Sequence, residues 1–300
     1  MITSAKTALI FVLCAVFCAQ LAPCQTIRDN RSNRVNGALE DWEARRRLTP
    51  EAMLQRVDYY NGFDTIYYDA DITVVYKGIT TAKKIKLFAE LDTKNVFIEF
   101  LNKEDYGTKY LKENARFYVN SQKLGETMLL SDKNLDEPAF DSNFMLKEFI
   151  SPETLFDNYT PTLVGTSVFD GRTAWLLDLK AKTETAFYPR QRIWLDKETY
   201  DMLHAEYYNK DDVRVRLYDL EYVEVLGDRR VPSEIEISVP GFERRTVMRR
   251  SKIIINEPFA DDLGIFDSNN LQYTSMYNTV ESRKFFKNYN TSGGISQANR

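Results

Sequence analysis

Residues 188–210 read YPRQRIWLDKETYDMLHAEYYNK, and this stretch decides the fold because it contains two apolar-rich strands joined by a polar corner. The flanks are rich in Ile, Trp, Leu and Tyr, which suit a pleated, half-buried surface. Between them, Asp196 and Thr199 can bond to nearby backbone groups, so the DKET segment favours a bend. A second turn at 209–212 and an alternating strand, VRVRLY at 213–218, follow directly. The stretch therefore predicts an antiparallel meander.

The same two-residue period dominates the chain from Asp69 to Ile255. In 85–91 the apolar residues fall on odd positions, with Phe88 as the exception, and 235–239 alternates in the same way. We count about ten such strands, each with one apolar and one polar face, which is typical of an antiparallel sheet with one face in water. A sheet of this length should curl. We predict a mainly β (α+β) protein whose curved antiparallel sheet forms an incomplete barrel.

Three short segments predict helices. Thr49 precedes a helix at 50–60 as its N-cap, with a proline in the first turn and one apolar stripe. Two further helices are expected at 143–149 and 151–158. The apolar side chains of these two have to be buried on the concave face of the sheet, and they are Phe144, Met145, Leu146, Phe149, Leu155 and Phe156. A curved sheet around Phe- and Met-rich helices indicates a container with a lid that can re-pack.

The first residues, 1–24, are predicted to be a secretory signal peptide, with a positive start and an apolar run over 8–22. The run is about 15 residues long, shorter than the roughly 20 of a spanning helix. Ala22 and Cys24 fit the −3 and −1 positions of a cut before Gln25. Alternatively, the Leu-Ala-Pro-Cys that ends at Cys24 resembles a degenerate lipobox, which would leave Cys24 lipidated. Both alternatives stay open.

Cysteine and histidine usage restricts the chemistry of the mature chain. All three cysteines, Cys14, Cys18 and Cys24, lie in the leader, so we expect no disulfide and no Cys-based metal site. His204 is the single histidine, so the His and Cys ligands of an ordinary zinc site are missing. No GxSxG elbow is present to partner His204 as a catalytic base. We therefore predict no catalytic residue, no metal and no cofactor, and give His204 a structural or exposed role.

The charged residues restrict the classes of function that remain. The formal net charge of −4 argues against nucleic acid as a partner. With forty-four acidic residues, a hydrolase using two carboxylates stays an alternative, and Asp211-Asp212 and Asp261-Asp262 are its candidate pairs. Both pairs lie in turn-like sequence, which favours solvated loop acids. Three basic runs are candidate contacts with an anionic membrane surface or a transporter: 45–47, 244–245 and 249–250.

The chain resembles the outer-membrane lipoprotein-sorting protein family, related to the LolA periplasmic carriers. RIWLDKETYDMLHAEYYNKDD at 192–212 is similar to the family's strand, Asp-Lys-x-Thr corner and Tyr-Tyr strand. GDRRVPSEIEI at 227–237 and INEPFADDLGIF at 255–266 resemble later family segments, so the resemblance spans about residues 48–271. One departure is plain: where members often carry Gly-Ser-Asp-Phe, residues 141–144 read Asp-Ser-Asn-Phe.

The resemblance implies a half-barrel of about eleven strands, with short helices covering its concave face and an apolar cavity for acyl chains. The domains expected are a signal peptide (1–24), a polar linker (25–47), the lipid-binding half-barrel (48–267) and a polar, partly disordered tail (268–300). The positions expected to line the cavity are Leu87, Ile98, Phe100, Val119, Phe144, Met145, Phe149, Trp175, Leu177, Leu179 and Ile237.

The function implied is that of a monomeric carrier in the periplasm of a diderm bacterium. It would bind the acyl chains of lipoproteins or other lipids and carry them toward the outer membrane, without catalysis, after loading by an inner-membrane transporter. A second hypothesis is a membrane-tethered lipoprotein acceptor, or an envelope sensor, on the same fold. A lipidated Cys24 would favour the tethered acceptor, and a free Gln25 the soluble carrier.

Overall fold

The computed structural model of the chain describes residues 49–131, 134, 137–146, 148, 154–184, 186–278 and 282–287. These residues belong to one compact unit. The predicted signal peptide and linker, Cys24 and Phe149 lie outside the described residues.

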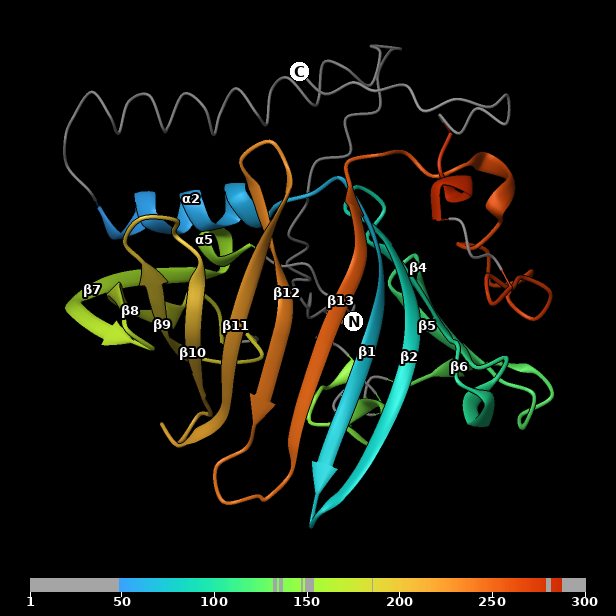
Figure 1. Cartoon of the computed structure of the whole chain (residues 1–300), viewed down its shortest axis with the longest axis horizontal. Helices are drawn as coiled ribbons and strands as arrows, with labels where there is room; N and C mark the ends of the chain where they lie inside the picture. The colour runs from blue at the N-terminus through green and yellow to red at the C-terminus, as the bar shows by residue number, and fades with distance from the viewer. Residues whose placement is uncertain are drawn as a thin grey trace, which may run out of the picture. The chain divides into compact units, whose positions relative to one another are not determined.

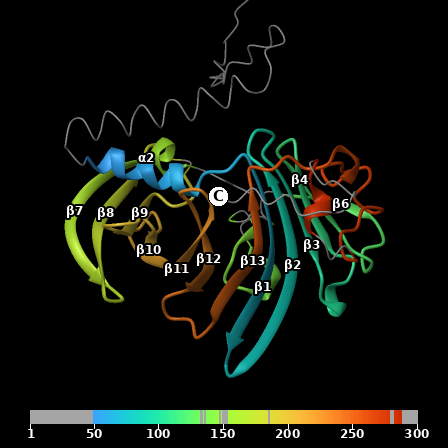
Figure 2. The same ribbon diagram turned by 45° about the horizontal axis from the view of Figure 1, so that its top comes forward.

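Thirteen strands form one antiparallel sheet within this described part of the chain, in the order β6-β5-β4-β3-β2-β1-β13-β12-β11-β10-β9-β8-β7. The sheet is strongly bent and stays open, with β6 and β7 as its edges (Figures 1 and 2). The predicted class is confirmed, with thirteen strands instead of about eleven. The strands are β1 (Thr65–Tyr76), β2 (Ile79–Glu90), β3 (Asn95–Phe100), β4 (Lys109–Glu113), β5 (Arg116–Asn120), β6 (Thr127–Leu130), β7 (Tyr159–Phe169), β8 (Arg172–Ala181), β9 (Arg190–Asp196), β10 (Met202–Tyr208), β11 (Arg214–Leu226), β12 (Arg229–Ser238) and β13 (Arg245–Ile255).

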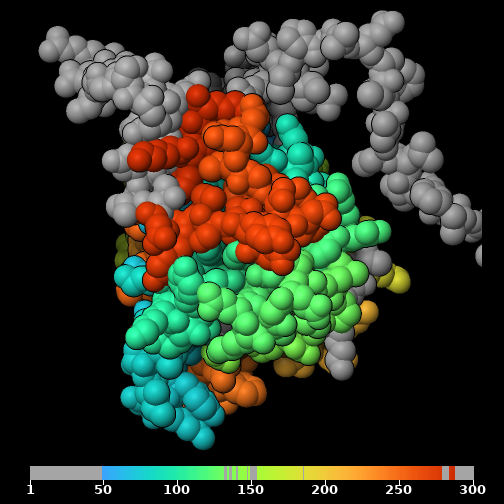
Figure 3. Space-filling view, turned by 90° about the vertical axis from the view of Figure 1, so that its right-hand side faces the viewer, coloured from blue at the N-terminus to red at the C-terminus, as the bar shows by residue number. Residues whose placement is uncertain are grey.

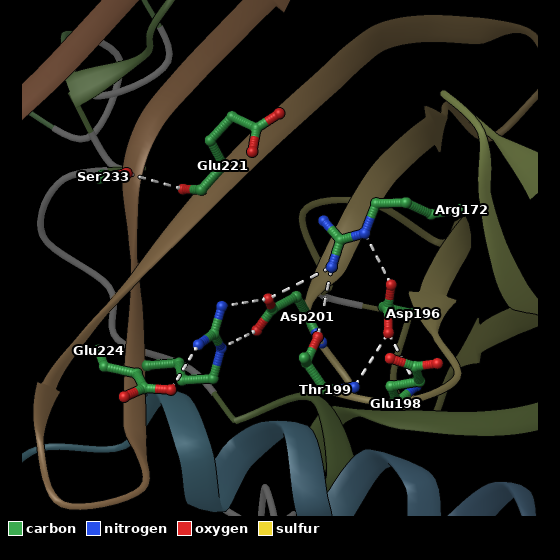
Figure 4. A network of polar contacts seen from close by, with 9 residues as sticks. Arg172, Asp196, Glu198, Thr199, Asp201, Glu221, Glu224 and Ser233 are labelled. Atoms are coloured by element: carbon green, nitrogen blue, oxygen red, sulfur yellow. Dashed lines mark hydrogen bonds and ion pairs between the residues drawn. The ribbon is translucent and has the colours of Figure 1, made fainter.

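The polar corner between β9 and β10 is built as its sequence predicts. Asp196 Oδ1 accepts a hydrogen bond from the backbone N–H of Thr199 at 2.9 Å, and its other oxygen accepts from Arg172 Nε at 2.7 Å. Asp201 is buried and accepts two hydrogen bonds from Arg230, each at 2.8 Å (Figure 4). The corner thus ties the β9–β10 turn to β8 and β12, so it fixes how these strands curve together.

Two helices lie against the β7–β12 half of the sheet (Figure 1). The first, α2 (Pro50–Asn61), begins as predicted, because Thr49 Oγ1 accepts from the backbone N–H of the third residue after it at 3.2 Å. Its apolar stripe, which includes Met53, is buried. The second, α5 (Leu155–Asn158), is joined to α2 because the Asp58 carboxylate accepts from its first two backbone N–H groups at 2.9 and 2.8 Å.

The inner face of the sheet is the face that carries Leu87, Ile98, Leu177 and Ile237. Two apolar clusters cover it. One spans β1–β3 and β11–β13, and the other joins α2 to β7–β10. The two clusters share Met202 and Tyr218 as partly buried neighbours, so the apolar surface is continuous across the bend.

The opposite, outer face of β1–β4 is also covered, by a C-terminal strap (residues 256–278 and 282–287; Figure 3). Tyr67, Phe88 and Phe97 point outward from the strands and pack against apolar side chains of the strap. The strap contributes Phe259, Ile265, Leu271, Met276, Phe285 and Phe286. The expectation of a sheet with one face in water is therefore wrong for β1–β4, and Phe88 breaks the alternation because β2 is buried on both faces.

Buried charges fasten the strap to the sheet. Lys109 Nζ donates to the backbone carbonyl of Leu271 at 2.7 Å, and Lys86 Nζ donates to that of Met276 at 3.0 Å. Glu99, fully buried between these lysines, accepts from the backbone N–H of Met276. Burial raises the pKa of Glu99 and lowers the pKa of both lysines. Three charged side chains, one each from β2, β3 and β4, thus hold the strap through hydrogen bonds to its backbone.

Candidate functional site

The apolar inner face is crossed by a lid segment, defined as residues 137–146 and 148. Its side chains Ala139, Phe144 and Leu146 are buried in the cluster formed by β1–β3 and β11–β13. The lid is far in sequence from the strands it covers. Its position is therefore set by tertiary contacts and not by a turn that joins it to a neighbouring strand. This arrangement puts a separable cover over an apolar surface.

The lid is less helical than its sequence predicts. Residues 143–145 are not helical, and Met145 instead forms an isolated bridge with Pro138. The backbone N–H of Met145 donates to Glu148 Oε2 at 2.7 Å, which is one half of a capping box for a helical turn beginning at Leu146. The predicted helix over 143–149 is therefore wrong at its start, because the backbone there bonds to the sheet.

Asn143 is the main polar attachment of the lid. Its Nδ2 donates to the backbone carbonyls of Ile237 at 3.1 Å and Arg244 at 2.7 Å, and its backbone N–H donates to Thr246 Oγ1 at 2.9 Å. Arg216 donates to its backbone carbonyl. Asn143 is buried, so each of these bonds replaces a contact with water that the closed lid excludes. One residue thus joins the lid to β11, β12 and β13.

Glu148 provides a second attachment, against a row of inner-face tyrosines. Tyr188 donates its hydroxyl hydrogen to Glu148 Oε1 at 2.8 Å, and Arg216 Nε lies 3.8 Å from the same oxygen. Tyr188, Tyr207 and Tyr218 follow one another with ring centroids 4.5 and 4.8 Å apart. Burial first, and then the Glu148 carboxylate, raise the pKa of all three phenols well above the usual value. The tyrosines therefore stay protonated.

Most of the predicted lining positions meet on the inner face. Seven are buried in its two clusters, namely Leu87, Ile98, Phe100, Phe144, Leu177, Leu179 and Ile237. Trp175 is partly buried beside them, and Met145 on the lid is also half-buried. Val119 is buried and pairs with Tyr110, which packs against the same face. That these side chains contact lipid remains a prediction.

The contact between Leu146 of the lid and strands β3–β6 leaves little free space. A hollow between Leu146 of the lid and β3–β6, lined also by Ile98 and Phe117, has a volume of about 10 Å³. This is about the space that one water molecule needs, whereas ligand pockets usually measure roughly 300–1,000 Å³. A large apolar ligand at this place would therefore require the lid to move.

Sequence reasoning did not identify Asn143, Arg216 or the tyrosine row as functional residues. A signal existed for Tyr207, which shares the apolar parity of Leu203 and Ala205 in β10. Tyr218 gave no such signal, because it shares its parity with Arg214 and Arg216. Asn143 was noted only as a departure from the family pattern. Its partners lie about a hundred residues away, and no local pattern could supply them.

The other candidate residues lie away from the inner face. His204 stacks on Phe169 at 4.8 Å, meets Trp194 edge-on, and places its Nδ1 2.5 Å from Asp219 Oδ1. The acid pairs at 211–212 and 261–262 are exposed. Within the described residues, no group of three or more His, Cys, Asp or Glu side chains could hold a metal ion. No helix in the same part of the chain is long and apolar enough to cross a membrane.

Residues 92–273 match a family described as "Uncharacterized protein", and the chain belongs to this family. A search of curated proteins found no match. Among solved structures, a DUF1329 family protein from Desulfovibrio piger has a TM-score of 0.65 at 20% identity, with 74% of this chain and 97% of that chain covered.

Two further structures share the fold. The first is described as an outer membrane lipoprotein-sorting protein domain from Vibrio parahaemolyticus. It has a TM-score of 0.65 at 16% identity, covering 74% of this chain and 98% of that one. A LolA superfamily protein from Nitrosomonas europaea has a TM-score of 0.58 at 14% identity, covering 70% and 95%. The expected structural relationship to LolA-like proteins is confirmed, and at these identities it concerns the fold.

Proposed function

We propose that this protein is a non-catalytic carrier that binds the acyl chains of lipoproteins or other lipids between the inner face and the lid segment. The observation that carries the proposal is the continuous apolar inner face, whose part on β1–β3 and β11–β13 is covered by a short segment with its own polar attachments. An apolar face of this size in water would aggregate unless it is covered. The lid covers the part on β1–β3 and β11–β13 in the empty protein, and acyl chains cover it in the loaded one.

The energetics fit such an exchange. An acyl chain gains roughly 0.8 kcal/mol for each CH₂ group removed from water, so a long chain can displace a lid that buries few large side chains. The lid attachments are hydrogen bonds of Asn143 and Glu148, which reform with water when the lid opens. The fold relatives with lipoprotein-sorting descriptions support the same assignment, and so do the lining positions predicted from the sequence.

Native mass spectrometry after gentle purification, together with displacement of a fluorescent fatty acid, tests the proposal. We expect co-purified lipid and saturable displacement by long-chain fatty acids. If no lipid co-purifies and no fluorescent fatty acid is bound, the carrier function is refuted. Tyr273→Ala, on the strap and away from the inner face, serves as the control variant.

Localisation and tethering belong to the same proposal. We expect export to the periplasm of a diderm bacterium, with a signal peptide over 1–24, the half-barrel domain over 48–267 and an inner-membrane transporter as the loading partner. The mass of the mature N-terminus separates the two forms of the proposal. A chain beginning at Gln25 supports the carrier, and a diacylated Cys24 supports the tethered acceptor.

A further inference from the structure

Two hairpin ends form an exposed apolar tip at the end of the sheet opposite α2 (Figure 1). Ile79, the first residue of β2, is 68% exposed, and Phe242 in the β12–β13 connection is 71% exposed. The β1–β2 turn is tight, because Lys77 and Gly78 both have positive φ angles of 51° and 77°. Tyr76, at the end of β1, is also exposed. Large apolar side chains held outward on short turns are costly in water and suit insertion into another phase.

The two ends act as one surface. The Arg244 guanidinium, from the β12–β13 connection, lies 5.2 Å from the centre of the Tyr76 ring in the β1–β2 hairpin. Lys77 Nζ, from the same hairpin as Tyr76, also lies 5.2 Å from the centre of this ring. Strand β1 pairs directly with β13, with Val75 opposite Arg245. A cation beside an exposed aromatic ring is an arrangement that favours the interface between lipid headgroups and acyl chains.

Charge at the tip is opposite to that of the chain. Residues 75–82 and 239–244 contain two basic residues, Lys77 and Arg244, and one acidic residue, Glu243, whereas the whole chain has a formal net charge of −4. An anionic surface would therefore attract this end and repel the remainder of the molecule. The charge pattern favours a bilayer that contains anionic lipid, approached tip first.

The tip is also bonded to the lid. The backbone carbonyl of Arg244, two residues after Phe242, accepts from Asn143 Nδ2 at 2.7 Å, and Thr246 Oγ1 accepts from the Asn143 backbone at 2.9 Å. A shift of the β12–β13 connection would move one acceptor of the lid attachment. Because the two sites share this backbone, a change at the tip is transmitted to Asn143 without any intermediate element.

We propose that the two hairpin ends are a membrane-docking tip that inserts Tyr76, Ile79 and Phe242 into an anionic bilayer, and that docking loosens the lid through Arg244. The loosening of the lid rests on the proposed carrier function, while the docking surface does not. Lipid would then enter or leave the inner face where the protein meets the membrane, instead of crossing water.

Vesicle flotation tests the docking surface. The purified protein is mixed with phosphatidylcholine vesicles that either contain or lack phosphatidylglycerol. We expect binding to the anionic vesicles, a loss of about tenfold in Phe242→Asp and in Ile79→Asp, and a loss of about fivefold in Lys77→Gln. Tyr273→Asp changes an aromatic residue that is 78% exposed on the strap, and it should bind like the parent protein. These side chains are exposed, so the variants should keep the parent melting temperature.

A second readout does not depend on an N-terminal anchor. In Phe242→Trp, the emission of the new indole should shift to shorter wavelength with anionic vesicles and be quenched by brominated lipid chains. Equal flotation of Phe242→Asp and the parent, or an unshifted and unquenched indole, overturns the docking surface. A concentration-dependent dimer that Phe242→Asp abolishes overturns it as well, in favour of a second copy of the chain.

The two proposals fail separately. Fatty-acid displacement without vesicles reports the inner face alone, and the tip variants should retain it. If the parent floats with anionic vesicles but binds no fatty acid, the carrier function fails and the docking surface stands. If the protein binds anionic vesicles and fatty acid, but the vesicles do not accelerate fatty-acid release, the coupling through Arg244 is overturned.

Discussion

Removing the side-chain amide of Asn143 should open the lid without unfolding the sheet. In Asn143→Ala the two bonds from Nδ2 to Ile237 and Arg244 are lost, while the bonds made by the Asn143 backbone remain. A buried hydrogen bond contributes a net of about 1 kcal/mol, so the closed lid should lose about 2 kcal/mol. Since 1.4 kcal/mol is a factor of ten, the open fraction should rise about thirtyfold.

Hydrogen exchange measures this opening directly. The backbone N–H of Phe144, a residue that the closed lid buries, donates to Ser142 Oγ at 3.0 Å. Opening of the lid exposes this residue to water, so its exchange should accelerate about thirtyfold. Amides in the centre of β12 and β13 should not change. If the opening limits entry, association of a fluorescent fatty acid should accelerate by the same factor.

The matched control is Asn209→Ala. Asn209 Oδ1 accepts two backbone hydrogen bonds, from Asp211 at 3.0 Å and Val213 at 2.9 Å, in the β10–β11 turn. This variant loses the same number of bonds and should leave both lid exchange and lipid entry unaltered. Unchanged exchange at Phe144 in Asn143→Ala would refute the attachment, and faster exchange with unchanged entry would refute the lid as the gate.

Three further predictions concern the strap, the inner face and acid stability. Glu99→Gln should cost about 3 kcal/mol in urea unfolding, since it removes the negative charge that faces Lys86 and Lys109 and weakens the bond from the Met276 backbone N–H. A loss under about 0.5 kcal/mol would contradict the role of Glu99 in holding the strap. Leu177→Glu or Phe100→Glu should weaken lipid binding, because a buried unpaired carboxylate is costly; unchanged affinity in the folded variants would refute the inner-face assignment. Hydrogen bonds from Arg190 lower the pKa of Asp178 in the folded protein. Ionised Asp178 therefore stabilises the fold above its unfolded pKa of about 3.9, and this contribution disappears as the pH falls through its folded pKa. Unfolding curves for Arg190→Gln between pH 6 and pH 2 should show a weaker pH dependence than those of the parent.

The inner face could be predicted from strand parity. Leu87, Ile98 and Leu177 follow the two-residue period, and the structure buries them together. The cover on the outer face could not be predicted in this way, because the strap spreads its apolar residues through a polar segment without a period. Phe88 and Phe97 were the visible signs, as aromatic side chains on the parity expected to face water.

The lid shows a different limit of sequence reasoning. Its apolar content correctly placed Phe144 on the inner face, but the helix expected from 143 onward begins only near Leu146. Local propensity favours a helix, whereas Asn143 gains hydrogen bonds to three separate strands when it is not helical. Contacts with residues about a hundred positions away outweigh the local preference, and a single sequence does not display them.

The lid and the strap bury different numbers of large apolar side chains, and this difference indicates which of the two opens more readily. Among the described residues, the lid buries two large apolar side chains, Phe144 and Leu146, whereas the strap buries six. At roughly 1.5–3 kcal/mol for each, the six described side chains of the strap contribute about three times as much hydrophobic stabilisation as the two described side chains of the lid. Amide exchange should follow this order, with Ala260, bonded to Phe285 at 2.9 Å, slower than Phe144. Equal exchange at the two amides would mean that the strap opens as readily as the lid, and the outer face would then be an equal candidate for the lipid site.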